Sequence, residues 1–171
     1  MKSVTINNQR GITMIMSLIL LFVTTIAAIA AGRGSGLQYI MAGNSAQSQI
    51  AYYAAEAGIE QGEAWIDTNI SSSGQRRALV NVSNNGVFQQ GDEPFDLSDL
   101  KLWFSRSDTK SANNAIVRGQ ARFMIRWLGE IAPLDPNYTG KRLNAFDVIA
   151  VGENDDGSVQ TQIISTVYRY L

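Results

Sequence analysis

Apolar residues form one uninterrupted stretch near the N-terminus. Residues 12–31 contain no charged side chain, and their only polar side chains belong to Thr13, Ser17, Thr24 and Thr25. A helix of this length reaches about 30 Å, which matches the hydrocarbon core of a bilayer. Hydroxyl groups are tolerated in such a helix because they can bond to its own carbonyl groups. The stretch therefore predicts a helix that is able to span a membrane.

Helical periodicity continues beyond residue 36. Apolar and small residues recur mostly three or four positions apart, at Leu37, Ile40, Met41, Ala51, Ala54, Ala55, Gly58, Ile59, Gly62, Trp65 and Ile66. This spacing predicts that the helix extends outward to about residue 66. Because its apolar stripe is narrow and rich in Ala and Gly, it can approach another helix or the chain's own domain closely.

Three glycines, Gly32, Gly34 and Gly36, separate the apolar stretch from this outer part. Each Gly lowers helix stability by up to about 1 kcal/mol relative to Ala. We therefore expect a weak point there, seen as a kink or a melted stretch. The alternative interpretation is a simple linker next to the membrane.

A row of carboxylates lies on one face of the expected outer helix, because Glu56, Glu60, Glu63 and Asp67 also repeat at intervals of three and four. The simplest interpretation is a solvated helix face. The alternative is a contact with basic residues of a neighbouring molecule.

Strand periodicity appears in the C-terminal third. Between residues 121 and 128 apolar side chains alternate with Arg122, Met124, Arg126 and Leu128, which predicts a strand with one wholly apolar face. Residues 146–151 predict a second strand, and a turn at 154–157 leads into a third at 158–170, forming a hairpin. We expect an antiparallel sheet of three or more strands packed on the outer helix, an α+β fold, because each element has one apolar face to bury.

The segments between these elements carry weaker patterns. Residues 78–82 and 100–104 are expected to form short strands. The connections are expected to be mostly loops, and long ordered loops are often functional; they are 67–77, 83–99, 105–120 and 129–144. Four acidic residues lie between Asp92 and Asp99, but they lack the dense oxygen spacing of a calcium loop, so no metal is predicted there.

Composition restricts the possible chemistry. The 171 residues suit one domain plus one extra element, and the net charge of −1 gives no basic excess for binding nucleic acid. Histidine and cysteine are absent, which excludes disulfides, zinc sites built on these residues, and Ser-His-Asp or Cys-His catalysis. Acid pairs at 92–93 and 155–156 have no recognisable base or nucleophile beside them. We therefore predict a protein that is not an enzyme and needs no cofactor.

The N-terminal segment permits three interpretations. It could be a cleaved secretory signal, although its apolar region is longer than the usual ~7–15 residues. It could be a plain membrane anchor, or it could be cut between Gly11 and Ile12 to leave the apolar helix as the mature N-terminus. Lys2 and Arg10 precede the span and Arg33 follows it, which favours a cytoplasmic N-terminus with the rest of the chain outside.

Residues 9–66 resemble the type IV prepilins and, within that group, the PilX-type minor pilins. The residues that carry the resemblance are Gln9-Arg10-Gly11, Leu37-Gln38, Met41-Ala42-Gly43-Asn44, Ala54-Ala55-Glu56-Ala57-Gly58-Ile59 and Glu63-Ala64-Trp65. The resemblance implies a pilin-like fold with four parts. These are a leader at 1–11, a membrane or filament-core half-helix at 12–36, an outer half-helix at 37–66 and an extracytoplasmic sheet domain at 67–171.

The resemblance also implies a life cycle. Prepilin peptidase would cut between Gly11 and Ile12 and N-methylate Ile12. The helix would lie in the inner membrane bilayer before assembly and in an extracellular pilus afterwards. The implied partners are other minor pilins, the major pilin and the inner-membrane assembly platform. Minor pilins of this kind prime pilus assembly and are thought to sit at or near the filament tip.

Two positions depart from the major-pilin pattern, which has Phe where this chain has Ile12 and Glu where it has Met16. The departure at Ile12 makes the expectation of N-methylation weaker than the expectation of cleavage. In a filament core that Glu offsets the amine of a neighbouring subunit, and either charge buried alone is costly. Its absence predicts a subunit with no neighbour ahead of it, at the tip. Alternatively, Met16 serves only as an apolar packing residue, and its presence does not imply a position at the tip. The other functions considered are a tip pseudopilin of type II secretion, which usually has a larger inserted domain, and a surface adhesin.

Overall fold

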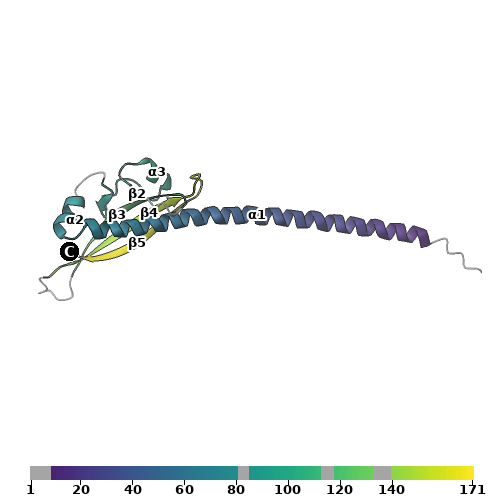
Figure 1. Ribbon diagram of the computed structural model, residues 1–171, viewed down its shortest axis with the longest axis horizontal. Coiled ribbons are helices and arrows are strands. Elements are labelled where there is room, and N and C mark those ends of the chain that lie inside the picture. The colour runs from purple at the N-terminus through teal and green to yellow at the C-terminus, as the bar shows by residue number, and fades with distance from the viewer. Residues whose placement is uncertain (1–8, 81–84, 113–117, 133–139) are drawn as a thin grey trace, which may run out of the picture. The chain divides into compact units, whose positions relative to one another are not determined.

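The computed structural model describes residues 9–80, 85–112, 118–132 and 140–171. The chain divides into two compact units, Met1–Asn44 and Ser45–Leu171, which we describe separately. One helix, α1 (Gln9–Asn69), runs through the first unit and on into the second (Figure 1). It confirms the long helix that the sequence predicts.

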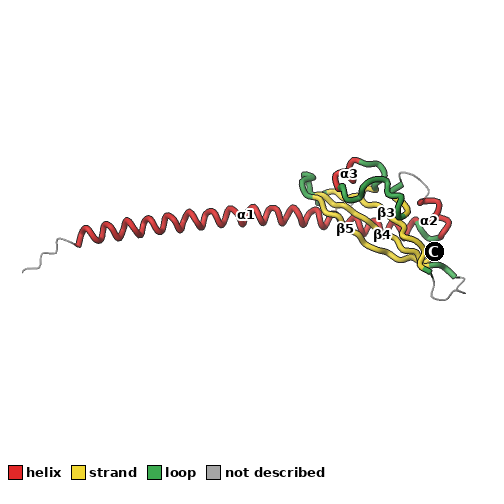
Figure 2. Tube along the Cα trace, turned by 180° about the vertical axis from the view of Figure 1, so that it is seen from behind, coloured by secondary structure: helices red, strands yellow, loops and turns green. Residues whose placement is uncertain are grey.

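The second unit is built on a five-stranded sheet in the order β1-β3-β4-β5, with β2 also paired to β3. The strands are β1 (Val87–Gln89), β2 (Lys110–Ala112), β3 (Gln120–Ile131), β4 (Leu143–Glu153) and β5 (Gln160–Tyr170). Strands β3, β4 and β5 form an antiparallel meander, which confirms the three predicted strands and their hairpin (Figure 2). Strand β1 pairs with β3 in parallel, so the sheet is mostly rather than wholly antiparallel.

Both faces of the sheet are covered. On one face Ile66 and Ile70 pack with Phe123, Ile125, Phe146, Val148 and Ala150 in a single buried cluster. On the other face Trp103 packs with Phe88, Met124, Ile149 and Val151. Successive residues of β3 and β4 therefore alternate between a helix α1 face and an α3 face, as the pleat of a strand requires. The long β4 is buried almost throughout because it has helices on both sides.

Helix α1 approaches the sheet closely because small residues face each other across the contact. A Cβ added to Gly62 would lie 2.3 Å from a Val148 methyl carbon, and one added to Gly58 would lie 2.9 Å from the Ala150 Cβ. On the strand side, a Cβ added to Gly152 would lie 2.2 Å from the Ala51 carbonyl oxygen. The Ala- and Gly-rich stripe therefore serves the domain's own packing.

Two predicted strands are wrong, because helices occupy these positions. Helix α2 (Ser73–Val80) covers the start of the expected strand at 78–82, whose last two residues lie outside the described ranges. The Ser72 hydroxyl accepts from the Gln75 amide, and the Gln75 side chain accepts from the Ser71 amide, an arrangement close to a capping box. Helix α3 (Leu100–Ser105) replaces the strand expected at 100–104, with Asp99 as its N-cap.

The connections are shorter than expected, because α2, β1 and β2 lie in segments that the sequence assigned to loops. The predicted turn of the β4–β5 hairpin is present. The Gly157 amide donates to the Asn154 carbonyl, and Gly157 has a φ of 72°, which a residue with a Cβ rarely adopts. The side-chain amide of Asn154 also donates to the side-chain oxygen of Gln47 on α1, which ties this turn to the helix.

Candidate functional site

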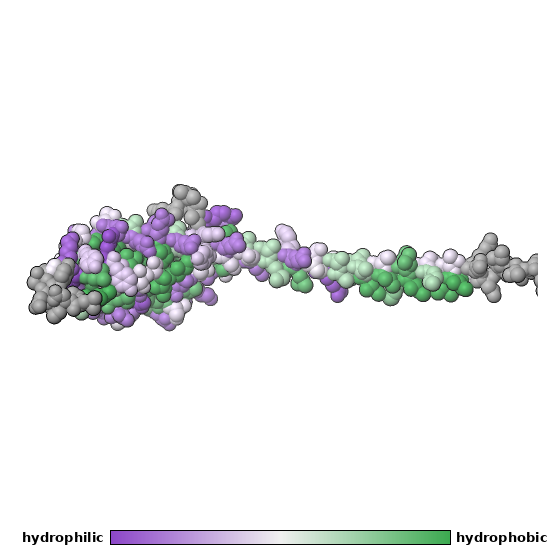
Figure 3. Space-filling model, turned by 90° about the horizontal axis from the view of Figure 1, so that it is seen from below, coloured by the Kyte–Doolittle hydropathy of each residue, from purple (hydrophilic) through white to green (hydrophobic). Residues whose placement is uncertain are grey.

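The apolar segment of α1 exposes its side chains on every side. Every residue from Gly11 to Asn44 of the first unit is exposed. The large apolar side chains between Ile12 and Ile29 are each more than half exposed. Figure 3 shows them as a continuous apolar surface along this part of the helix. A surface of this size calls for a lipid or protein partner, because water is a poor solvent for it.

Polar side chains in this segment bond within the helix. The Ser17 hydroxyl donates to the Met14 carbonyl at 2.8 Å, and the Thr24 and Thr25 hydroxyls both donate to the Leu21 carbonyl. These bonds confirm the expected back-bonding at three positions and leave the segment without exposed donors there. By length and composition, α1 is the one helix among the described residues that could cross a membrane.

The predicted cleavage and assembly positions all lie within this helix. Gly11 and Ile12 are its third and fourth residues, and Met16 follows one turn later with 65% of its surface exposed. Between Gly11 and Arg33, helix α1 carries no charged side chain. Helix α1 is also unbroken at Gly32, Gly34 and Gly36, so the structure contains no melted stretch there. Glycine lowers helix stability without forbidding helical geometry, and the weak point stays a prediction.

The carboxylate row on α1 divides into two parts. Glu56 and Glu60 are exposed, and a hydrogen bond to Glu56 raises the pKa of Tyr52. Glu63 accepts from the Ser165 hydroxyl at 2.8 Å, and Asp67 forms an ion pair with Arg169. Half of the row therefore bonds to strand β5 of the same chain, which neither interpretation of the sequence anticipated.

The acidic residues between 92 and 99 stabilise local structure. Glu93 pairs with Arg126, and its pKa is lowered chiefly by hydrogen bonds from its own backbone amide and that of Gly91. Asp96 accepts from the hydroxyl and amide of Ser98, which lowers its pKa. Within the described ranges no three acidic residues converge as a metal site would require.

The acid pair at 155–156 is likewise structural. Asp155 pairs with Arg118 and accepts from the Gly119 amide, which ties the β4–β5 turn to the start of β3. Asp156 accepts from the Ser158 hydroxyl and amide, and these bonds lower its pKa. Both carboxylates therefore stabilise the turn and its contact with β3.

A buried and a half-buried charge outside the predicted sites are also neutralised or shielded. Asp108 accepts three hydrogen bonds from Arg106, and these hold the pKa of its carboxyl below the ordinary range. The Lys110 ammonium lies 4.4 Å from the centre of the Trp65 ring, and burial lowers its pKa. The first pair holds the segment between α3 and β2 together, and the second packs the start of β2 against helix α1.

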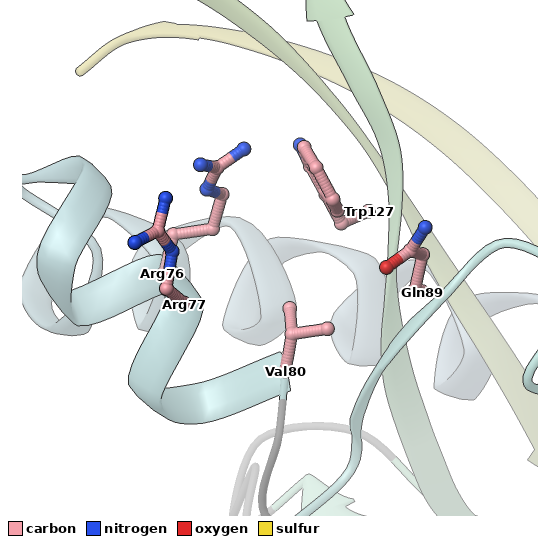
Figure 4. Close-up of a pocket in the computed structure, with 5 residues that line it drawn as sticks. All are labelled: Arg76, Arg77, Val80, Gln89 and Trp127. Atoms are coloured by element: carbon pink, nitrogen blue, oxygen red, sulfur yellow. The ribbon is translucent and has the colours of Figure 1, made fainter.

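One pocket in the second unit was missed by the sequence reasoning. Arg76, Arg77 and Val80 of α2, with Gln89 and Trp127, line a cavity of about 290 Å³ (Figure 4). The Arg76 guanidinium lies 4.1 Å from the centre of the Trp127 ring. Its other contacts are Asn144 at 3.0 Å and Glu130 at 3.3 Å. The capping residues Ser72 and Gln75 were the available indication of this helix.

A long N-terminal helix packed on a mostly antiparallel sheet is the pilin-like α+β fold. Residues 10–60 match the family model described as PilX N-terminal. The N-terminal segment of the chain is thus similar to that of type IV pilin-like minor pilins, and its apolar helix is suited to anchor a pilin in a membrane. A pilin is structural rather than enzymatic, and its partners in general are pilus proteins. Searches of the curated proteins and of the solved structures found no match.

Proposed function

We propose that this chain is a minor pilin that primes type IV pilus assembly and occupies a position at or near the filament tip. The observation that carries the proposal is the exposed, uncharged segment of α1 at residues 12–31. Lipid can cover this surface before assembly, and the helices of neighbouring subunits can cover it afterwards. Moving the segment from lipid to the filament requires that both surroundings suit an apolar surface. A polar group without a hydrogen-bond partner would raise the free energy of the segment in one of them.

The route to this state begins with removal of residues 1–11. Cleavage between Gly11 and Ile12 would place a new amine at the start of the apolar segment and would leave Ile12 available for methylation. The single span would lie in the inner membrane with a cytoplasmic N-terminus, and residues 67–171 would lie outside. Prepilin peptidase, the assembly platform, the major pilin and other minor pilins are the partners that this route requires.

Intact mass measurement tests the route. In cells that contain prepilin peptidase, we expect the mature protein to lack Met1–Gly11, with or without one added methyl group. In peptidase-deficient cells the full chain should accumulate. A mature species that retains residues 1–11 in wild-type cells would remove the prepilin interpretation, and trimming of the whole apolar segment would show an ordinary secretory signal.

Tip placement is supported by Met16, which stands where a major pilin carries an assembly carboxylate. A subunit that has no neighbour ahead of it has no incoming amine to neutralise, so a carboxylate is unnecessary there. We expect Met16→Glu to leave pilus number within about twofold of the wild type when it complements a deletion strain, because a lone carboxyl at an exposed filament end can stay solvated or protonate. Met16→Leu is the matched apolar control. Loss of pili with Glu but not with Leu would show that the site is buried against another subunit.

A further inference from the structure

Positive charge exceeds negative charge at the pocket beneath helix α2. Arg76 and Arg77 line it, and Arg142 lies 3.8 Å from Glu130, the carboxylate that pairs with Arg76. Glu130 is thus shared between two guanidinium groups and is partly exposed. Arg77 is exposed and makes no hydrogen bond or ion pair with any residue that the structure describes. Glu130 therefore balances Arg76 and Arg142 together, while the charge of Arg77 has no carboxylate partner among the described residues.

The Arg76 side chain is fixed in position and incompletely satisfied. Only 6% of it is exposed, and it is held between the Trp127 ring, Asn144 and Glu130. The Trp127 indole donates to the same Asn144 oxygen at 3.1 Å, which fixes the ring as well. The Arg76 Nε is buried without a hydrogen-bond partner. A cationic wall that is already rigid loses little conformational entropy on binding an anion.

We propose that this pocket binds a carboxylate, of the kind that an acidic side chain of a neighbouring protein subunit presents. Guanidinium groups match carboxylates in shape as well as charge, since they offer paired donors in one plane. The volume of about 290 Å³ lies at the lower end for ligand sites, which suits a side chain better than a larger molecule. The exposed Gln89 amide and the Val80 methyl groups suit the polar head and the methylene stem of such a side chain.

The proposal rests on the proposed function only for the source of the carboxylate, because a pilus surrounds each subunit with other subunits. The chemistry of the pocket can be measured without any filament. A negative result there would leave the cleavage and complementation results unaffected, and a failure of those tests would leave the pocket's affinity measurable.

The test is a titration of the full chain in non-ionic detergent micelles, followed by NMR of ¹⁵N-labelled tryptophan indoles. N-acetylglutamate N-methylamide is the probe, and N-acetylglutamine N-methylamide is its neutral isostere. We expect a saturable shift of the Trp127 indole with the glutamate probe alone, while Trp65 and Trp103 serve as internal references. An equal response to the neutral amide, or tighter binding of inorganic phosphate, would overturn the proposal. Acetate distinguishes a protein side chain from a small free carboxylate as the natural ligand. If acetate binds as tightly as the glutamate probe, the pocket is a site for a small free carboxylate and the proposal is overturned.

Two substitutions localise the binding. Arg77→Gln should weaken the probe's affinity by about fivefold through loss of a charged donor, without harming the fold, because Arg77 is exposed. Lys101→Gln on helix α3 removes the same charge on the other face of the sheet and should leave the affinity unchanged. Glu130→Gln should tighten binding, since it removes the competing carboxylate. Equal affinities for the wild type and Arg77→Gln would place any binding elsewhere.

Discussion

Replacing Leu21 with Arg is expected to reduce membrane association of this protein more than any other single change. Leu21 lies in the middle of the uncharged segment at 12–31 and is exposed on α1. An Arg at the centre of a membrane helix disfavours insertion by about 3 kcal/mol relative to Leu, which is roughly a hundredfold in the insertion equilibrium. Fractionation of cells that express the full chain, with and without carbonate extraction, measures the effect.

Leu21→Ala is the matched control, because it shortens the side chain without adding charge. We expect this variant to remain with the membrane. Equal membrane retention of the Arg and Ala variants would mean that lipid does not cover this helix face, and it would remove the central premise of the proposed function. Loss of both variants would point to packing of Leu21 rather than to its polarity.

The second large effect is expected at Gly152, where strand β4 meets helix α1. An Ala Cβ there would lie 2.2 Å from the Ala51 carbonyl oxygen and 2.3 Å from the Ala55 backbone nitrogen. Backbone atoms of a helix cannot move aside as a flexible side chain can, so helix and sheet must separate. We expect Gly152→Ala to lower the free energy of unfolding by about 3 kcal/mol, the upper range for overpacking. Urea unfolding of the full chain in micelles, followed by tryptophan fluorescence, measures this change.

Gly74 provides the control for Gly152. It lies in α2, and the nearest atom to an added Cβ is the Ser72 hydroxyl oxygen at 3.9 Å. Gly74→Ala should leave stability unchanged or raise it by up to about 1 kcal/mol through better helix propensity. If both variants unfold at the same urea concentration, the close helix–sheet contact does not limit stability.

The long helix and the β3–β4–β5 meander were predictable because their periodic patterns extend over many residues. Eleven or twelve residues of strand, as in β3 and β4, provide enough alternation to be recognised. Even so, the alternation in β3 suggested one apolar face, whereas Met124 on the opposite face is as deeply buried as Ile125. The sequence could not reveal that α3 covers that second face.

The two short helices were wrongly predicted as strands, because the strand preference of their residues was given more weight than the helix-capping residues before them. Residues 78–82 and 100–104 are rich in residues that suit strands, yet α2 and α3 form there. The caps at Ser72 and Asp99 were readable, but each occupies only one or two positions. The pocket at α2 could therefore not be predicted either, because Arg76 is held there by Asn144, which lies 68 positions later in the chain. Long-range contacts of this kind have no local sequence pattern.

The glycine contacts between α1 and the sheet also have a mechanical consequence. If pulling moved the helix lengthwise by one turn, about 5.4 Å, a residue four positions away would enter each contact. Slippage in one direction would drive Ile66 into the space at Gly62, where Val148 leaves no room even for a Cβ. Slippage in the other would set Ala54 at the site of Gly58, against Ala150. Both directions meet steric resistance, so tension applied to the helix would be transmitted to the sheet as shear.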